Sequence, residues 1–194
     1  LHSKSANPRA ALTLIPTDEG KSWIHMGENS DWRMYDFVED SLCLQAPECP
    51  EDFYQSAIAF GTFQQQLTDF PAETLHETIH NFHNTPDRYR LFRQVLAGDV
   101  MGRAASVQPE IDFALAHEEV GGKLAAMLRS GELPLRVTHN DTKLNNVMLD
   151  ASTRKALCVI DLDTTMPGLS AYDFGDSIRF GAATAAEDEK DLDK

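Results

Sequence analysis

Long apolar runs, basic residues and cysteines are all scarce in this sequence of 194 residues. No apolar run approaches the roughly 20 residues that a membrane-spanning helix needs, so no transmembrane segment is predicted. Lys and Arg number 17 against 31 Asp and Glu, and the net charge of −14 argues against an extended nucleic-acid-binding surface. The polar start, Leu1 to Ala11, shows no signal-peptide pattern. We therefore expect a cytoplasmic protein that binds neither nucleic acid nor membranes.

The three cysteines, Cys43, Cys49 and Cys158, are odd in number and lack the spacing of metal ligands. Free thiols in a reducing compartment are the simplest interpretation. Cys158 belongs to the apolar run Ala156 to Ile160 and is expected in the core. With 42% hydrophobic and 25% charged residues, the composition is typical of a globular protein of one domain or slightly more.

One stretch, from Arg136 to Gly168, places polar residues at the ends of short apolar runs. Such runs are typical of short strands, so the polar positions are expected in the loops that connect them. The first loop contains the pattern H-x-D-x-K-x-x-N, formed by His139, Asp141, Lys143 and Asn146. A second polar group, D-L-D, ends the next apolar run.

Phosphoryl transfer needs a carboxylate that accepts the proton of the attacking hydroxyl, and oxygen ligands that hold magnesium against the phosphates. In protein kinases a His, an Asp, an Asn and a later Asp occur in this order. The pattern therefore predicts Asp141 as the base and Asn146 and Asp161 as metal ligands. Asp163 is the reserve candidate for the metal.

Two further residues of the first loop have expected roles. Lys143 is predicted to neutralise charge on the transferred phosphoryl group, and His139 to orient the loop. A loop rich in Asn and Asp can also be no more than a turn. The correctly spaced second acidic group favours the catalytic interpretation.

Three segments carry a family resemblance: HNDTKLNNVMLD, VIDLDTTMPG and YDFGDSIRFG. Together they resemble the aminoglycoside phosphotransferase family of small-molecule kinases, above all the bacterial N-acetylhexosamine 1-kinases. The resemblance extends from about Trp32 to the last residue. It is specific for kinase chemistry and less specific for the acceptor sugar.

The resemblance implies an α+β, protein-kinase-like fold. Residues 1–38 would be the end of the N-lobe sheet with the hinge, and residues 39–194 the helical C-lobe. ATP and Mg²⁺ are the implied cofactors, and Tyr35, Phe37 and Glu39 would lie in the hinge against which adenine binds. The implied reaction is phosphorylation of the anomeric hydroxyl of an N-acetylhexosamine.

The chain begins with Leu rather than Met and looks like the later part of a longer protein. The Gly-rich loop and the strand Lys of the kinase pattern would then precede Leu1. Further helices that contact the acceptor would follow Lys194. We therefore expect the 194-residue piece alone to transfer little phosphate.

The acceptor side is less specific. The segment FHNT followed by Arg88 resembles a family segment near the acceptor pocket, which makes His83, Asn84 and Arg88 candidate substrate contacts; a hydrogen-bonded loop is the alternative. Other acceptors (an aminoglycoside, choline, ethanolamine or homoserine) and a kinase-like binding module also stay open.

A different class of function is suggested by His76-Glu77-x-x-His80, which matches the H-E-x-x-H of zinc hydrolases. That site requires a helix and a third ligand. Nearby prolines and β-branched residues, and the lack of a third ligand at a typical spacing, argue against it.

Periodicity predicts strands at Ala10 to Ile15, Ser22 to Met26 and Trp32 to Val38. It predicts helices at the following positions: Phe53 to Phe70, Tyr89 to Gly98 and Gln108 to Leu128. The segment Tyr172 to Gly181 is expected to begin another helix. The charge run Glu187 to Lys194 is expected to be a solvated helix start or a frayed end.

The tripeptide Asp173-Phe174-Gly175 spells the D-F-G of protein kinases. It lies beyond the Pro167-Gly168 turn, where a helix is expected to start. A carboxylate there is better placed to cap the helix or brace the catalytic loop, so we predict that Asp161 and not Asp173 binds the metal.

Overall fold

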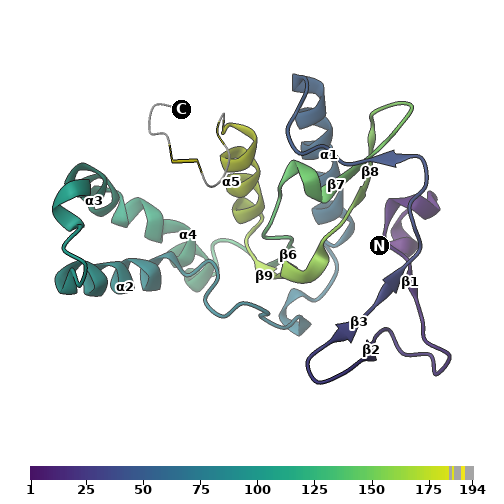
Figure 1. The fold of residues 1–194 in the computed structure, drawn as a ribbon, viewed down its shortest axis with the longest axis horizontal. Coiled ribbons are helices and arrows are strands. Elements are labelled where there is room, and N and C mark those ends of the chain that lie inside the picture. The colour runs from purple at the N-terminus through teal and green to yellow at the C-terminus, as the bar shows by residue number, and fades with distance from the viewer. Residues whose placement is uncertain (184, 186–188, 191–194) are drawn as a thin grey trace.

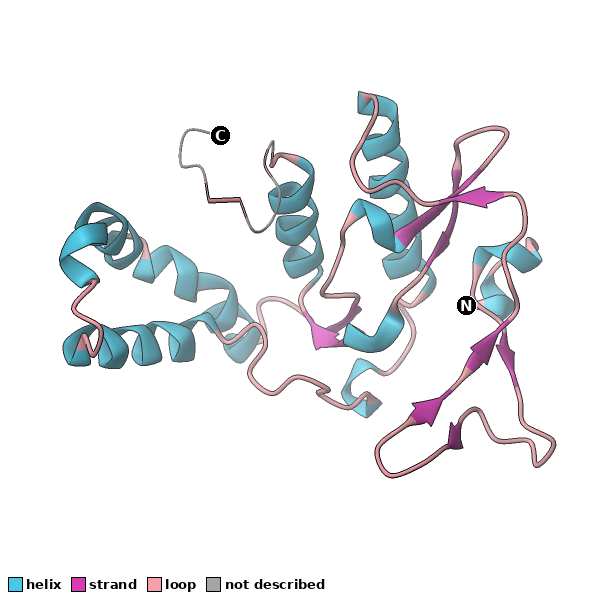
Figure 2. Cartoon of the chain, in the orientation of Figure 1, coloured by secondary structure: helices cyan, strands magenta, loops and turns pink. Residues whose placement is uncertain are grey.

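A computed structural model describes residues 1–183, 185 and 189–190. Most of the charge run Glu187 to Lys194 lies outside this range. Three parts follow one another along the long axis: a ribbon of short strands near the N-terminus, a central part of strands and two helices, and a helical unit at the other end (Figure 1). The mixture of helices and small antiparallel sheets confirms the predicted α+β class (Figure 2).

The N-terminal ribbon consists of two short strand pairs. β1 (Leu14–Ile15) pairs with β4 (Met34–Tyr35), and β2 (Ile24–His25) pairs with β3 (Asp31–Trp32), all antiparallel. β1 and β2 lie within predicted strands but are shorter, and two short strands, β3 and β4, replace the single strand predicted at Trp32 to Val38. Several of their apolar side chains are exposed, among them Trp32 at 60%. Because few apolar side chains are buried within the ribbon, longer strand pairs would gain little stability there.

The central part contains the core. β7 (Val147–Asp150) is the middle strand of a sheet, between β5 (Ser41–Leu42) and β8 (Ala156–Val159). Helix α1 (Pro50–Gln66) packs on β8. The buried core cluster comprises Ala59, Phe60, Phe63, Ala72, Val137, Val147, Leu149 and Val159.

Helix α1 begins before the predicted Phe53 because of its N-terminal cap. Pro50 occupies the first turn, where its missing N–H costs nothing. The Asp52 carboxylate accepts hydrogen bonds from the backbone N–H groups of Glu48 (3.0 Å) and Cys49 (3.1 Å). The helix ends at Gln66, before the predicted Phe70.

A second sheet is formed by the two ends of the stretch from Arg136 to Gly168. β6 (Arg136–Thr138) pairs with β9 (Met166–Gly168), and helix α5 (Ser170–Gly181) follows directly. Gly168 allows the close approach of the two strands, since a Cβ there would lie 2.4 Å from Thr138 Oγ1. The loop between β6 and β7 is thereby held against the start of α5.

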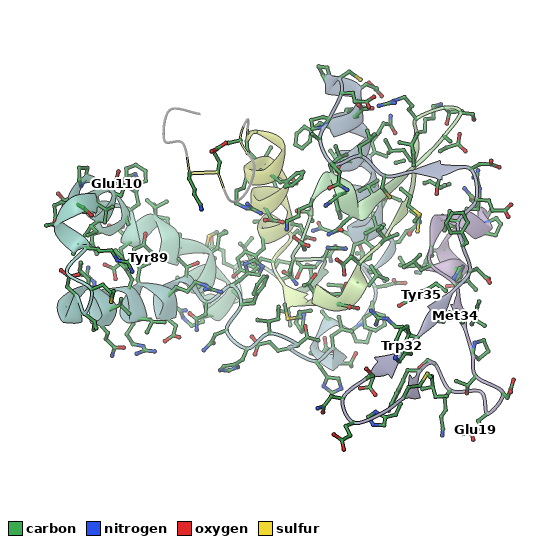
Figure 3. The ribbon with its side chains drawn as sticks, viewed as in Figure 1. Glu19, Trp32, Met34, Tyr35, Tyr89 and Glu110 are labelled. Atoms are coloured by element: carbon green, nitrogen blue, oxygen red, sulfur yellow. The ribbon has the colours of Figure 1, made fainter. Side chains whose placement is uncertain are left out.

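The helical unit contains α2 (Thr85–Gly98), α3 (Gln108–Ala116) and α4 (Glu118–Ser130). The predicted continuous helix Gln108 to Leu128 is wrong, because the chain leaves helical geometry at His117 (φ −101°, ψ 6°). The Tyr89 hydroxyl, in the part of α2 labelled in Figure 3, donates to the Ala114 carbonyl at 2.9 Å. This tertiary contact joins α2 to the end of α3.

The segment His76 to His80 is not helical, so the two histidines of the H-E-x-x-H pattern do not lie on one helix face. His80 Nδ1 lies 3.2 Å from Glu77 Oε2. Within the described ranges, no group of three His, Cys, Asp or Glu side chains is placed to hold a metal ion. The zinc hydrolase alternative therefore lacks the helix on which it depended.

None of the helices in the described part of the chain is both long and apolar enough to span a membrane. Cys43 and Cys49 are exposed free thiols, and Cys158 is buried, as predicted. Burial raises the pKa of Cys158 to about 11, which makes this thiol unreactive.

Candidate active site

Asp141, Lys143 and Asn146 converge in the loop between β6 and β7. Asn146 Nδ2 donates to the Asp141 carboxylate at 3.0 Å and to the Asp141 carbonyl at 2.9 Å. Lys143 Nζ lies 3.4 Å from the other carboxylate oxygen. Asp141 is 27% exposed, so its carboxylate is oriented by partners and still reachable from solvent. A general base needs this combination.

His139 connects this loop to the end of β8. Its side chain is fully buried, and Nε2 lies 2.8 Å from the Ile160 carbonyl. Because a carbonyl only accepts, Nε2 must carry the proton, and Nδ1 then accepts from the Asp141 backbone N–H at 3.3 Å. The rings of Phe60 and Phe63 pack edge-on against the imidazole. These contacts support the orienting role that was predicted for His139.

Asp161 lies beside Asn146, because the backbone N–H of Ile160 donates to the Asn146 carbonyl at 2.9 Å. β8 ends at Val159, however, and Asp161 has left-handed geometry (φ 57°, ψ 59°) at the start of a short 3-10 turn, Leu162–Thr164. The strand does not continue to Asp163, so Asp161 and Asp163 do not share a strand face. Instead, the carboxylate of Asp163 pairs with Arg33.

Asp173 of the D-F-G tripeptide braces the loop from α5. Its buried carboxylate accepts from the backbone N–H groups of His139 (3.0 Å) and Asn140 (2.8 Å), and from Gln64 Nε2 (2.6 Å). These contacts occupy three of the roughly four lone-pair sites of the carboxylate, which leaves it poorly available to a metal. Asp173 thus braces the loop, one of the two roles that its position at the start of a helix predicted.

Sequence reasoning missed other side chains that hold the loop. Asp176 accepts from the Thr142 N–H at 2.7 Å and pairs with Arg179. Asn140 has a φ of 68°, and its Nδ2 donates to the Thr164 carbonyl at 2.8 Å. The tolerance of Asn for left-handed backbone was the one available signal.

Residues 6–192 match the model of the phosphotransferase enzyme family known as APH. The chain belongs to this family. The solved structure titled "Structure of the microcompartment-associated aminopropanol kinase" has a similar fold, with a TM-score of 0.54 and 18% sequence identity. The match covers 89% of this chain and 53% of that one, so the chain spans about half the length of that protein.

Asn146 and Asp161 are the residues that would hold a magnesium ion, if this phosphotransferase-family chain binds one as predicted. Since Asn146 directs its amide nitrogen at Asp141, its amide oxygen is the atom left for a cation. Asp161 is exposed beside it. Mg²⁺ is typically held by one or two protein oxygens together with substrate phosphates and water, and the residues present fit it.

The predicted substrate residues separate into two groups. His83 and Asn84 line a pocket of about 300 Å³ together with Tyr172, on whose ring His83 stacks at 4.4 Å. Burial lowers the pKa of His83, and the nearby Asn140 side chain only partly offsets this effect. The Arg88 guanidinium donates to the Phe82 carbonyl at 2.7 Å and so closes its own loop.

The predicted hinge residues lie in and after β4. Tyr35 ends the strand, Phe37 is 84% exposed, and the Glu39 carbonyl accepts from Arg9 at 3.1 Å. The chain then enters β5, which pairs with β7. The short segment between β4 and β5 thus connects the ribbon to the sheet that contains β7, the strand that follows the loop of Asp141.

Proposed function

We propose that the protein is an ATP- and Mg²⁺-dependent phosphotransferase that acts on a hydroxyl group of a small molecule. The observation that carries this proposal is the Asp141 carboxylate, oriented by Asn146 and Lys143 within a loop that Asp173 braces. Catalysis of phosphoryl transfer depends mainly on positioning and on electrostatic stabilisation. Such a rigid, charged loop is the kind of site that this chemistry requires.

In this proposal Asp141 orients the acceptor hydroxyl and accepts its proton as the oxygen attacks phosphorus. Lys143 offsets negative charge on the transferred group, and His139 holds the backbone of Asp141. Asn146 and Asp161 would hold Mg²⁺, which when bound neutralises phosphate charge. Asp173 has no ligand role.

The nucleotide would lie against residues 35–39, including Tyr35, Phe37 and Glu39. This proposal places the boundary between the N-lobe remainder and the C-lobe at residues 38 and 39. It is supported by the position of this segment between the ribbon and β5. The cytoplasmic location expected from the sequence likewise stays a prediction.

For the acceptor, an N-acetylhexosamine phosphorylated at its anomeric hydroxyl is our first candidate, on the motif resemblance. The pocket beside His83 has the size of small-ligand sites and both polar and aromatic walls, which suits a sugar. An amino alcohol is the second candidate, since the protein of similar fold is titled an aminopropanol kinase.

The direct test is transfer of labelled phosphate from ATP to a panel of N-acetylhexosamines, amino alcohols and aminoglycosides by the protein at its full natural length. The Asp141→Asn variant is the control. We expect Mg²⁺-dependent transfer to one acceptor class, which the control loses. Nucleotide binding without transfer to any acceptor would instead support the kinase-like binding module.

A further inference from the structure

Arg33 joins the N-terminal ribbon to the turn that carries Asp161. Its guanidinium pairs with the Asp163 carboxylate and lies 5.6 Å from the centre of the Tyr35 ring. Asp163 raises the pKa of Arg33, and Asp161 adds a smaller effect of the same sign. One side chain thus contacts an expected hinge residue and a neighbour of the expected metal ligand. Figure 3 labels Trp32, Met34 and Tyr35 in the ribbon, and Glu19 at its outer turn.

The turn after Asp161 needs to be held. Asp161 has left-handed backbone, which is costly for a residue other than glycine. Three segments distant in sequence grip this turn. Thr78 Oγ1 donates to the Asp163 carbonyl at 3.2 Å, Asn140 Nδ2 to the Thr164 carbonyl at 2.8 Å, and Arg33 pairs with the Asp163 side chain. Of these three contacts, the ion pair with Arg33 is the one that involves a charged group and links the turn to the ribbon.

We propose that Arg33 is a positioning residue that couples nucleotide binding at the hinge to Mg²⁺ binding at Asp161. It does so by keeping the Asp163 carboxylate away from the metal and by fixing the turn that begins at Asp161, next to the Ile160–Asn146 backbone hydrogen bond. This inference rests on the proposed function. Nucleotide that orders Tyr35 also orders Arg33, and through Asp163 the metal-binding turn. By linkage, Mg²⁺ must then strengthen nucleotide binding by the same factor.

The test is calorimetric titration of ADP into the native protein with and without Mg²⁺. Coupling between sites is typically a factor of about 5 to 150. We expect Arg33→Met to reduce the Mg²⁺-dependent gain in ADP affinity by about 5-fold or more, and Arg33→Lys to reduce it less, since Lys keeps the charge but not the planar contact with Tyr35. Arg93→Met is the matched control: Arg93 makes a similarly exposed ion pair with Glu118, far from the site.

A double-mutant cycle separates coupling from simple loss of a contact. Arg33→Met, Asp163→Asn and the double variant are expected to lose the same coupling, so the double loses no more than either single variant. Folding is checked by melting. The only two tryptophans, Trp23 and Trp32, lie in the ribbon, so fluorescence gives a second readout. Mg²⁺-ADP is expected to change the emission of the native protein and not that of Arg33→Met.

Two results would overturn the inference. One is an unchanged Mg²⁺ gain in the Arg33→Met protein, and the other is additive losses in the cycle. Failure of the proposed function looks different. In that case the native protein itself would show no Mg²⁺ gain, or Asp161→Ala would retain it.

Discussion

The carboxylate of Asp173 receives the backbone N–H groups of His139 and Asn140, the two residues directly before Asp141. Asp173 is only 3% exposed and lies in the first turn of α5. Helix α5, through Asp173, thus fixes the backbone position of the loop between β6 and β7. This arrangement separates residues that shape the loop from residues that act in it.

Removing the brace should therefore reduce stability rather than metal binding. Asp173→Ala leaves two buried N–H groups without partners, at about 1–3 kcal/mol each. We expect a clearly lower melting temperature, with Mg²⁺-dependent ADP binding kept in the fraction that stays folded. Asp161→Ala should show the reverse pattern. If the folded Asp173→Ala protein loses the Mg²⁺ dependence while Asp161→Ala keeps it, the metal assignment is wrong.

In the protein at its full natural length, Asp141→Asn should reduce turnover by about 10²-fold or more, because a positioned base acts on the acceptor in the transition state. Nucleotide affinity should change little, since the nucleotide is expected to be held by other residues. Steady-state kinetics and calorimetric ADP binding on the same preparation test both parts. Near-normal turnover would remove Asp141 from the role of base.

His83 should make the stability depend on pH. Its pKa is lowered on folding by burial, so below its usual value of 6.5 the unfolded chain binds the proton more readily than the folded chain. This residue therefore destabilises the fold as the pH falls below that value and has no such effect well above it. Melting temperatures compared between about pH 8 and about pH 5.5 should fall less for His83→Gln than for the native protein. Parallel curves would contradict this prediction.

Gly168→Ala should destabilise the β6–β9 pair. The added Cβ would lie 2.4 Å from Thr138 Oγ1 and 3.2 Å from its methyl carbon, and overpacking of this kind costs about 1–3 kcal/mol. Gly175→Ala in α5 is the matched control. Within the described residues, and apart from the adjacent residues and the helix's own backbone, no atom lies within 4 Å of a Cβ added there, so the helix should gain stability or stay unchanged. Chemical denaturation of both variants measures the difference, and equal stability of the two would show that the strands can adjust.

Local patterns predicted much of the fold. The end of α2 at Gly98 agrees with prediction, and α5 begins at Ser170, close to the predicted Tyr172, because apolar periodicity acts within one element. Boundaries that depend on partners were missed. The Asp52 cap moved the start of α1, and the chain bends at His117, where the Tyr89 hydroxyl bonds to Ala114 close by. Neither contact leaves a signal in the local pattern.

For the site, the sequence by itself determined the family and the chemical groups: residue types in a fixed order, with the loop spacing that brings Asp141 and Asn146 within hydrogen-bonding distance. Short loops allow this because few conformations connect neighbouring strands. Only the tertiary structure decided which carboxylates remain available. Asp163 is paired with Arg33 and Asp173 is used by backbone N–H groups, both through residues distant in the chain. The sequence alone does not show whether a carboxylate is available, because what it can bind depends on the hydrogen-bond donors and charges that folding brings to it.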